Sequence, residues 1–77
     1  MDKDKIKEII ENTLKGSSAE VDGGEGKYTA NIIYKGFEGL NTIKRHKLVY
    51  SSLNSYIKSG ELHAISLKTF SSEEEKT

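Results

Sequence analysis

The sequence predicts a small α+β domain in which two helices cover one face of a three-stranded mixed sheet. Two amphipathic segments, with apolar residues three and four positions apart, predict the helices. Three shorter segments with alternating apolar residues predict the strands, giving the order helix, strand, strand, helix, strand. A sheet covered by helices on one face is the simplest way to bury both helical stripes.

The first half of the chain predicts a helix followed by a β-hairpin. The helix is expected at about residues 3–15, where Gly16 can end it in a left-handed conformation. Its apolar residues recur at helical spacing: Ile6, Ile9, Ile10 and Leu14. Residues 17–22 and 27–34 are expected to form antiparallel strands joined by a glycine-rich loop at 23–26. One face of the second strand is mostly apolar: Tyr28, Ala30, Ile32 and Tyr34.

The second half predicts a long helix and a final strand. Residues 36–39 break the preceding strand, Asn41 is a good N-cap, and Gly60 follows a helix that runs to about Lys58. One stripe of this helix is expected to face the sheet: Ile43, His46, Tyr50, Leu53 and Ile57. Residues 62–70 form the last strand, and a helix of this length permits a crossover, so this strand can pair in parallel with a hairpin strand.

The length of 77 residues predicts one domain spanning 1–77. We expect its core at about residues 3–70 and a flexible C-terminal tail at 71–77, in which residues 72–75 look like the capped start of a frayed turn. A chain this short has no room for a separate catalytic domain. No spacing of Ser, His and carboxylates places a nucleophile beside a base, so we expect no enzyme and no small-molecule substrate.

Composition excludes several kinds of site. The chain has no cysteine, which excludes a disulfide, a thiol nucleophile and an iron–sulfur site made by this chain alone. Twelve Lys and Arg balance twelve Asp and Glu, so there is no overall positive charge to favour nucleic acid. No apolar run has transmembrane or secretory length, so we expect a cytoplasmic protein that contacts no membrane, or an organellar one after removal of a transit segment.

Three blocks of sequence resemble a known family. They are Phe37-Glu38-Gly39, then residues 45–50 with Leu53, then residues 63–69 (His-Ala-Ile-Ser-Leu-Lys-Thr). In order and spacing they resemble the BolA-like proteins, over about residues 4–70. The resemblance implies a helix-on-sheet fold related to class II KH domains, which agrees with the order of elements predicted above.

The resemblance also implies a partner and a cofactor. BolA-like proteins pair with monothiol glutaredoxins that carry a Cys-Gly-Phe-Ser active site, and the pair holds a 2Fe–2S cluster. Its ligands are the glutaredoxin cysteine, a glutathione thiol and a histidine at the position of His63. A second family ligand, His or Cys, lies in the hairpin loop, but residues 22–29 contain neither. The alternatives are a mixed-ligand cluster, an apo complex, a weak oxygen ligand such as Glu25, or glutathione in a further position.

The expected partner surface is the rim of the sheet and the second helix near His63. We expect a monomer in isolation, without a cofactor, that docks on glutaredoxin through Arg45, His46, Lys47, Ala64 and Lys68. His46 lies on the apolar stripe, so we interpret it as a half-buried histidine hydrogen-bonded within the fold and assign it no metal.

A second hypothesis is a transcriptional regulator that binds DNA or another nucleic acid. Its candidate residues are Gly36 and Gly39 of a Gly-x-x-Gly turn and the basic start of the second helix: Lys44, Arg45 and Lys47. Glu38 within the turn would repel a phosphate backbone, and a solvated helical face is the simpler interpretation of the charges.

Overall fold

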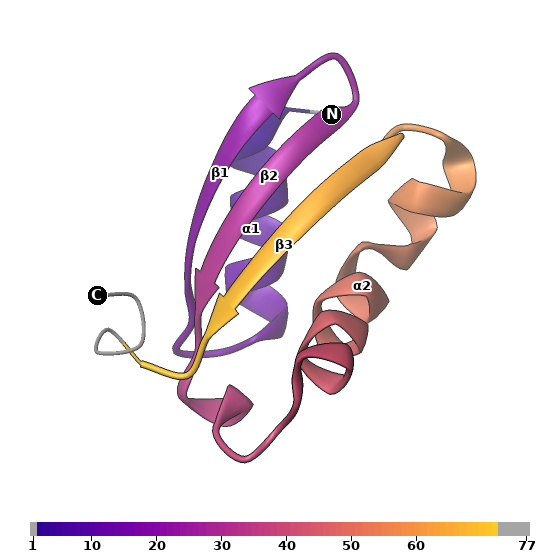
Figure 1. The fold of residues 1–77 in the computed structure, drawn as a ribbon. Coiled ribbons are helices and arrows are strands. Elements are labelled where there is room, and N and C mark those ends of the chain that lie inside the picture. The colour runs from indigo at the N-terminus through magenta and orange to yellow at the C-terminus, as the bar shows by residue number, and fades with distance from the viewer. Residues whose placement is uncertain (1, 73–77) are drawn as a thin grey trace.

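The protein is a three-stranded sheet backed by two helices (Figure 1). The computed structural model describes residues 2–72. The elements are α1 (Lys3–Thr13), β1 (Ser18–Gly24), β2 (Lys27–Ile33), the short 3-10 turn η1 (Lys35–Phe37), α2 (Thr42–Ser59) and β3 (Ala64–Phe70). The predicted order of elements is confirmed. Of the predicted tail, Ser71 is buried, and residues 73–77 lie outside the described residues.

The sheet is mixed, as predicted. Its strands lie in the order β1-β2-β3, with β1 and β2 antiparallel and β2 and β3 parallel. The predicted loop at 23–26 is shorter in the structure, because strand pairing continues to Gly24 and Lys27. Only Glu25 and Gly26 form the turn, with φ angles of 54° and 81°. A two-residue turn with both residues left-handed matches the natural twist of a hairpin, which allows β1 to extend further than predicted.

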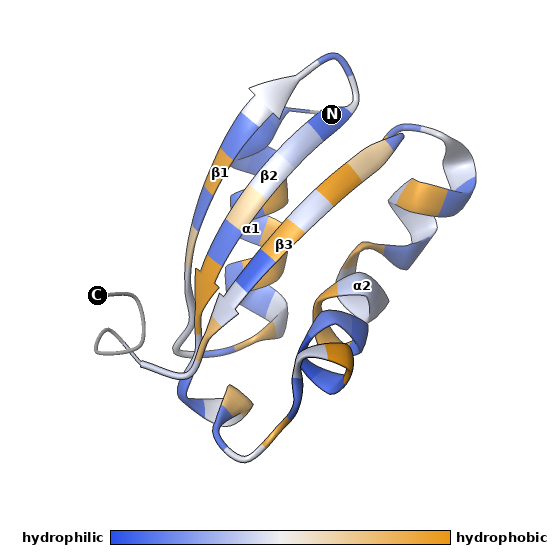
Figure 2. Cartoon of the chain, viewed as in Figure 1, coloured by the Kyte–Doolittle hydropathy of each residue, from blue (hydrophilic) through white to orange (hydrophobic). Residues whose placement is uncertain are grey.

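The core lies between the helices and one face of the sheet. Hydrophobic and polar residues alternate along the strands (Figure 2). The buried side chains come from every element: Ile6, Ile10, Leu14, Ala19, Tyr28, Ala30, Ile32, Phe37, Val49, Leu53, Leu62 and Leu67. The predicted apolar face of β2 is therefore confirmed, with Tyr34 packed against the core from its margin. Within the described part of the chain, no helix lies over the opposite face of the sheet (Figure 1).

The prediction that this stripe of α2 faces the sheet is wrong. Only Leu53 of the five residues is buried, whereas Ile43 is 67% exposed and Tyr50 and Ile57 are each 38% exposed. Val49, which was not assigned to the stripe, is completely buried. The physical reason is the width of the sheet. Figure 1 shows part of α2 beyond the edge of β3. The sheet therefore covers only one side of the helix, and Ile43, Tyr50 and Ile57 of the predicted stripe stay exposed.

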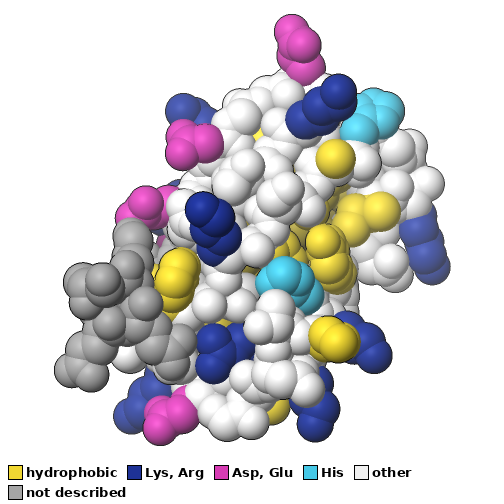
Figure 3. Space-filling model, viewed as in Figure 1, with side chains coloured by type: hydrophobic (Ala, Val, Ile, Leu, Met, Phe, Trp, Pro, Cys, Tyr) yellow, Lys and Arg dark blue, Asp and Glu magenta, His cyan; other side chains and the backbone are white. Residues whose placement is uncertain are grey.

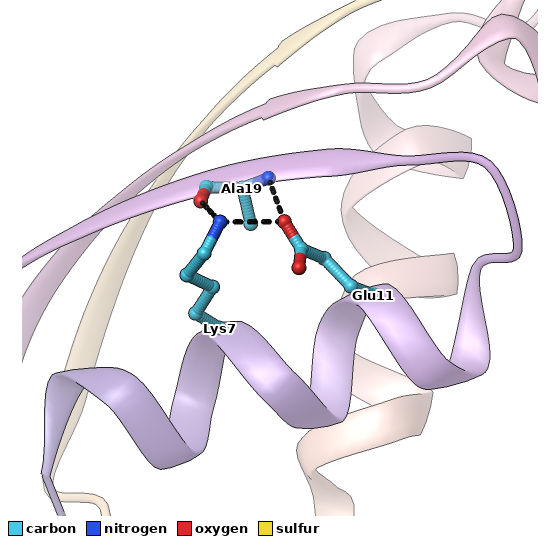
Figure 4. A network of polar contacts seen from close by, with 3 residues as sticks. All are labelled: Lys7, Glu11 and Ala19. Carbon is cyan, nitrogen blue, oxygen red and sulfur yellow. Dashed lines mark hydrogen bonds and ion pairs between the residues drawn. The ribbon is translucent and has the colours of Figure 1, made fainter.

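A polar clasp from α1 closes the free edge of β1 (Figure 4). Glu11 Oε2 accepts a hydrogen bond of 2.9 Å from the Ala19 N–H and forms an ion pair with Lys7 Nζ at 2.7 Å. Lys7 Nζ also donates to the Ala19 carbonyl at 2.8 Å. Both backbone groups of Ala19 are thus satisfied by side chains, which prevents another strand from pairing there.

We expect this clasp to weaken in acid. The hydrogen bond from Lys7 and then the one from the Ala19 N–H hold the pKa of Glu11 below its ordinary value of 4.5. A carboxyl group with a lowered folded-state pKa stabilises the fold above its unfolded value, and this contribution is lost as pH falls through the folded value. The difference in free energy of unfolding between wild type and Glu11→Gln should therefore shrink below about pH 4.5 in urea titrations. A difference that stays constant down to full protonation would contradict this assignment.

Candidate functional site

His63 lies at one end of the sheet, between the end of α2 and the start of β3. Gly60 ends α2 in a left-handed conformation with φ of 85°, and the chain then turns back toward the sheet. The N–H of Ala64 donates a hydrogen bond of 2.9 Å to the carbonyl of Gly26. This bond fixes the start of β3 against the β1–β2 turn, and it leaves the His63 side chain exposed at the rim.

The imidazole of His63 lies against Gly26. A β-carbon built on Gly26 would collide with the Cδ2 atom of the ring. Two features therefore favour glycine at position 26. The turn is left-handed there, and the side chain of a residue 37 positions further along the sequence approaches it closely. The Cδ2 side of the imidazole therefore lies against the hairpin turn.

The hairpin turn brings few metal-binding groups to His63. Glu25 is the acidic residue of the turn, and the turn holds no histidine or cysteine. Within residues 2–72, no group of three or more His, Cys, Asp or Glu side chains could hold a metal ion. The described chain therefore offers one imidazole at this rim, and any metal centre there needs most of its ligands from outside.

An apolar hollow adjoins His63. It lies between the end of α2 and the start of β3, and its walls are formed by Tyr50, Ile57, Leu62, His63, Ala64 and Ile65. The Tyr50 hydroxyl donates a long hydrogen bond of 3.4 Å across it to the Ile65 carbonyl. Figure 3 shows hydrophobic side chains gathered over this boundary, beside the histidines. Exposed apolar surface beside a polar group of this kind is typical of a protein interaction site.

The sequence did not identify the residues of this hollow as a site. Tyr50 and Ile57 were assigned to the buried stripe, and Leu62 and Ile65 to the last strand. Local sequence signals indicate where α2 and β3 begin and end. The hollow depends on how the two elements pack against each other, which these signals do not show. The sequence feature that could have indicated the hollow is the presence of apolar residues close to Gly60 and His63.

The predicted partner residues are divided between two regions. Ala64 adjoins His63, whereas Arg45, His46 and Lys47 lie on the first half of α2. Arg45 is held within the fold: its Nε donates to the Leu40 carbonyl at 2.8 Å and its Nη1 to the Thr69 carbonyl at 3.4 Å. This second contact places Arg45 near the end of β3 that is opposite His63.

The remaining predicted partner residues are more accessible. His46 is half-buried, and its ring packs edge-on against Tyr50 at 6.3 Å between centroids. Lys47 is exposed on α2, and Lys68 is exposed on the face of the sheet without helices. The predicted set is therefore divided between α2 and β3 and does not form one cluster around His63.

The residues of the nucleic-acid hypothesis have structural roles of their own. Gly36 has no room for a β-carbon because the Tyr34 ring lies against it, and Gly39 is left-handed with φ of 82° before α2 begins. Lys44 and Lys47 are exposed. Packing and turn geometry account for the two glycines without a nucleic acid.

The family of the chain follows from comparison with known proteins. Residues 3–74 match the family model described as BolA-like protein. The chain belongs to the BolA-like family. This BolA-like chain is 35% identical to a protein from the rpoN-murA intergenic region of Acinetobacter guillouiae, over 96% of this chain and 89% of that one. It is 26% identical to the acid stress protein IbaG of Escherichia coli, over 91% and 83% of the two chains.

Solved structures support the same membership. A BolA homologue from Coxiella burnetii superposes with a TM-score of 0.88 and 33% identity, covering 100% of this chain and 99% of that one. BolA1 of Arabidopsis thaliana gives a TM-score of 0.76 and 29% identity, covering 88% of each chain. The family consists in general of regulators or adaptors and not of enzymes. No helix within residues 2–72 is long and apolar enough to cross a membrane.

Proposed function

We propose that this BolA-like protein is a non-enzymatic adaptor that docks on a monothiol glutaredoxin and shares a 2Fe–2S cluster with it. Its role would be in the assembly or trafficking of iron–sulfur clusters or in iron regulation, in the cytoplasm. One observation carries the proposal: the exposed imidazole of His63 is held against the hairpin turn, beside an apolar hollow. An exposed imidazole at the rim can bind a metal that a partner presents there.

The donor set agrees with a shared cluster but not with one held by this chain alone. A neutral imidazole is a suitable ligand for iron in a cluster, and it can replace a thiolate there. The other ligands have to be thiolates of the glutaredoxin and of glutathione, because this chain has no cysteine. The absence of His and Cys from the hairpin turn predicts weaker retention of the cluster than in a complex with two BolA ligands. The fourth ligand of the cluster would then be Glu25 or a further glutathione.

The hollow supplies the protein–protein part of the proposal. Tyr50, Ile57 and Ile65 offer apolar surface next to the metal ligand, so a partner that buries it would exclude water from the cluster. Docking through this surface does not require the cluster. Binding to the apo glutaredoxin is therefore expected as well, with the cluster adding affinity.

We expect His63→Ala to abolish the response to a cluster while the fold remains intact. His63 is exposed, so its removal leaves no cavity in the core. Cluster-loaded monothiol glutaredoxin should be titrated to saturation with wild type, with His63→Ala and with His46→Ala, a variant that removes a predicted docking residue but not the proposed cluster ligand. Visible absorption and circular dichroism should change with wild type and with His46→Ala but not with His63→Ala.

Two results would contradict the proposal. An unchanged spectrum with wild type would exclude a shared cluster, and the same spectral change with His63→Ala would exclude His63 as its ligand. Calorimetry with the apo glutaredoxin separates docking from ligation, because His63→Ala should lose little of that affinity.

Nucleic-acid binding is the second candidate, and the charge of α2 favours it. The helix carries Lys44, Arg45, Lys47 and Lys58 and no acidic residue. Binding through phosphates should weaken steeply as salt rises and should not depend on His63. Fluorescence anisotropy of a labelled DNA duplex at two salt concentrations, with wild type and His63→Ala, distinguishes this function from the shared cluster.

A further inference from the structure

The two free edges of the sheet are protected to different degrees. On the β1 edge, Lys7 and Glu11 bind both backbone groups of Ala19 at 2.8 and 2.9 Å. On the β3 edge, the bonds are longer. The Tyr50 hydroxyl reaches the Ile65 carbonyl and the Arg45 guanidinium reaches the Thr69 carbonyl, each at 3.4 Å. The β3 edge is therefore the one that can exchange its side-chain partners for a new strand at smaller cost.

The hydrogen bonds of β3 show which of its backbone groups face this free edge. The Ala64 N–H and the Phe70 carbonyl bond toward β2, through the Gly26 carbonyl and the Tyr34 N–H. The N–H and C=O of one strand residue point to the same side, and successive residues alternate. Ala64, Ser66, Lys68 and Phe70 thus pair with β2, while Ile65, Leu67 and Thr69 direct their backbone groups away from it.

A row of side chains on α2 includes Tyr50, whose hydroxyl bonds the Ile65 carbonyl at this edge. It consists of Ile43, His46, Tyr50 and Ile57, and we call it the outer stripe. These residues are spaced by three, four and seven positions, so they share one side of the helix. Ile43 is 67% exposed, and Figure 3 shows hydrophobic side chains along the boundary of β3 and α2. A three-stranded sheet is too narrow to cover the outer stripe, and one more strand beside β3 would cover it.

The charge of the same region indicates the chemistry of that strand. Every charged residue of α2 is basic, and Lys68 of β3 is exposed. A second copy of the chain would bring two basic helices together, which disfavours pairing between copies. An acidic strand would instead be attracted.

We propose that the β3 edge binds an extended, acidic polypeptide segment of a partner protein as a fourth strand. Main-chain hydrogen bonds form to Ile65, Leu67 and Thr69, in place of the long bonds from Tyr50 and Arg45. Alternate apolar side chains of the segment pack on the outer stripe, and the acidic residues between them project to the open face of the sheet, where Lys68 is exposed. This mode of recognition uses backbone pairing for affinity and side-chain pockets for specificity. It needs neither His63 nor a cluster.

The test uses the full-length apoprotein without glutaredoxin, so its outcome is separate from that of the proposed function. The probe is a capped peptide in which glutamate alternates with valine, and the control peptide has lysine in place of glutamate. Amide hydrogen exchange is followed by NMR. At saturation with the glutamate peptide, exchange at Ile65, Leu67 and Thr69 should slow about tenfold or more, while Val21 on the β1 edge is unchanged.

Matched variants test the outer stripe. Ile43→Glu should weaken the binding of the glutamate peptide about tenfold. Leu48→Glu places the same charge on another side of α2, at a residue that is 37% exposed, and should change the affinity much less. Both substitutions are at exposed residues, and circular dichroism verifies that each variant is folded.

Several outcomes would overturn the proposal. These are the absence of protection at the β3 amides, equal binding of the lysine peptide, and equal effects of the two variants. Protection by a single-stranded oligonucleotide but not by the peptide would assign this face to nucleic acid. A concentration-dependent dimer whose interface protects the same amides would assign it to a second copy of the chain.

Discussion

Replacement of Phe37 by alanine is expected to lower the free energy of unfolding by about 3–5 kcal/mol, the usual range for a buried aromatic residue. Phe37 is completely buried. Its ring packs edge-on against Tyr34 at 5.1 Å between centroids, and the Arg45 guanidinium lies 5.8 Å from the ring centroid. Alanine would leave a cavity at the point where the chain passes from β2 into α2.

In a domain of this length such a loss is severe. A stability of about 0.05–0.15 kcal/mol per residue is usual, so Phe37→Ala removes a large part of the total. Thermal and urea unfolding followed by circular dichroism should show the effect, with Leu48→Ala as the control. Leu48 is 37% exposed, and its truncation should change stability by about 0.5 kcal/mol or less. A loss below about 1 kcal/mol for Phe37→Ala would mean that neighbouring side chains collapse into the space.

The order of elements could be predicted because each element has a local signal. The spacing of Ile6, Ile10 and Leu14 is determined by the geometry of a helix, and the alternation along β2 by the geometry of a strand. The Asn41 side chain accepts a hydrogen bond from the Lys44 N–H, as expected for an N-cap. The parallel pairing of β3 followed from the length of the connecting helix.

The orientation of α2 could not be predicted, because it depends on the width of the sheet. Helical spacing fits a stripe through Tyr50 and Leu53 almost as well as one through Val49 and Leu53, since neighbouring stripes share residues. The structure buries Val49 because part of α2 lies beyond β3. Periodicity shows that a helix is amphipathic, but it does not show how much of the apolar side the fold will cover.

The candidate site shows the same limit. The resemblance in sequence identified His63 as a candidate ligand, but it does not show where the side chain lies or what it contacts. The contact with Gly26 joins positions 37 apart, and the sequence of either segment alone gives no signal for it. Similarly, Arg45 is a basic residue in the sequence, but the structure shows its guanidinium bonded to the Leu40 and Thr69 carbonyls. Which polar groups are used within the fold is decided by tertiary packing.

Gly26→Ala is expected to abolish the response to cluster-loaded glutaredoxin almost as completely as His63→Ala, although His63 itself is retained. Gly26 has φ of 81°, and a β-carbon there would collide with the imidazole. The ring must therefore leave its position at the rim. The left-handed backbone adds a loss of stability of about 1–2 kcal/mol for a residue with a β-carbon, which the fold should survive.

Gly24→Ala is the matched control for this prediction. Gly24 lies on the other side of the same turn, its φ is not positive, and a β-carbon there has no neighbour within 4 Å. Urea unfolding, the NMR signals of the His63 ring and the cluster titration should therefore all stay close to wild type for Gly24→Ala, while Gly26→Ala changes all three. If Gly26→Ala is folded and still gives the wild-type cluster spectrum, the hairpin turn does not position the ligand. The imidazole would then bind the cluster from whatever orientation the partner imposes.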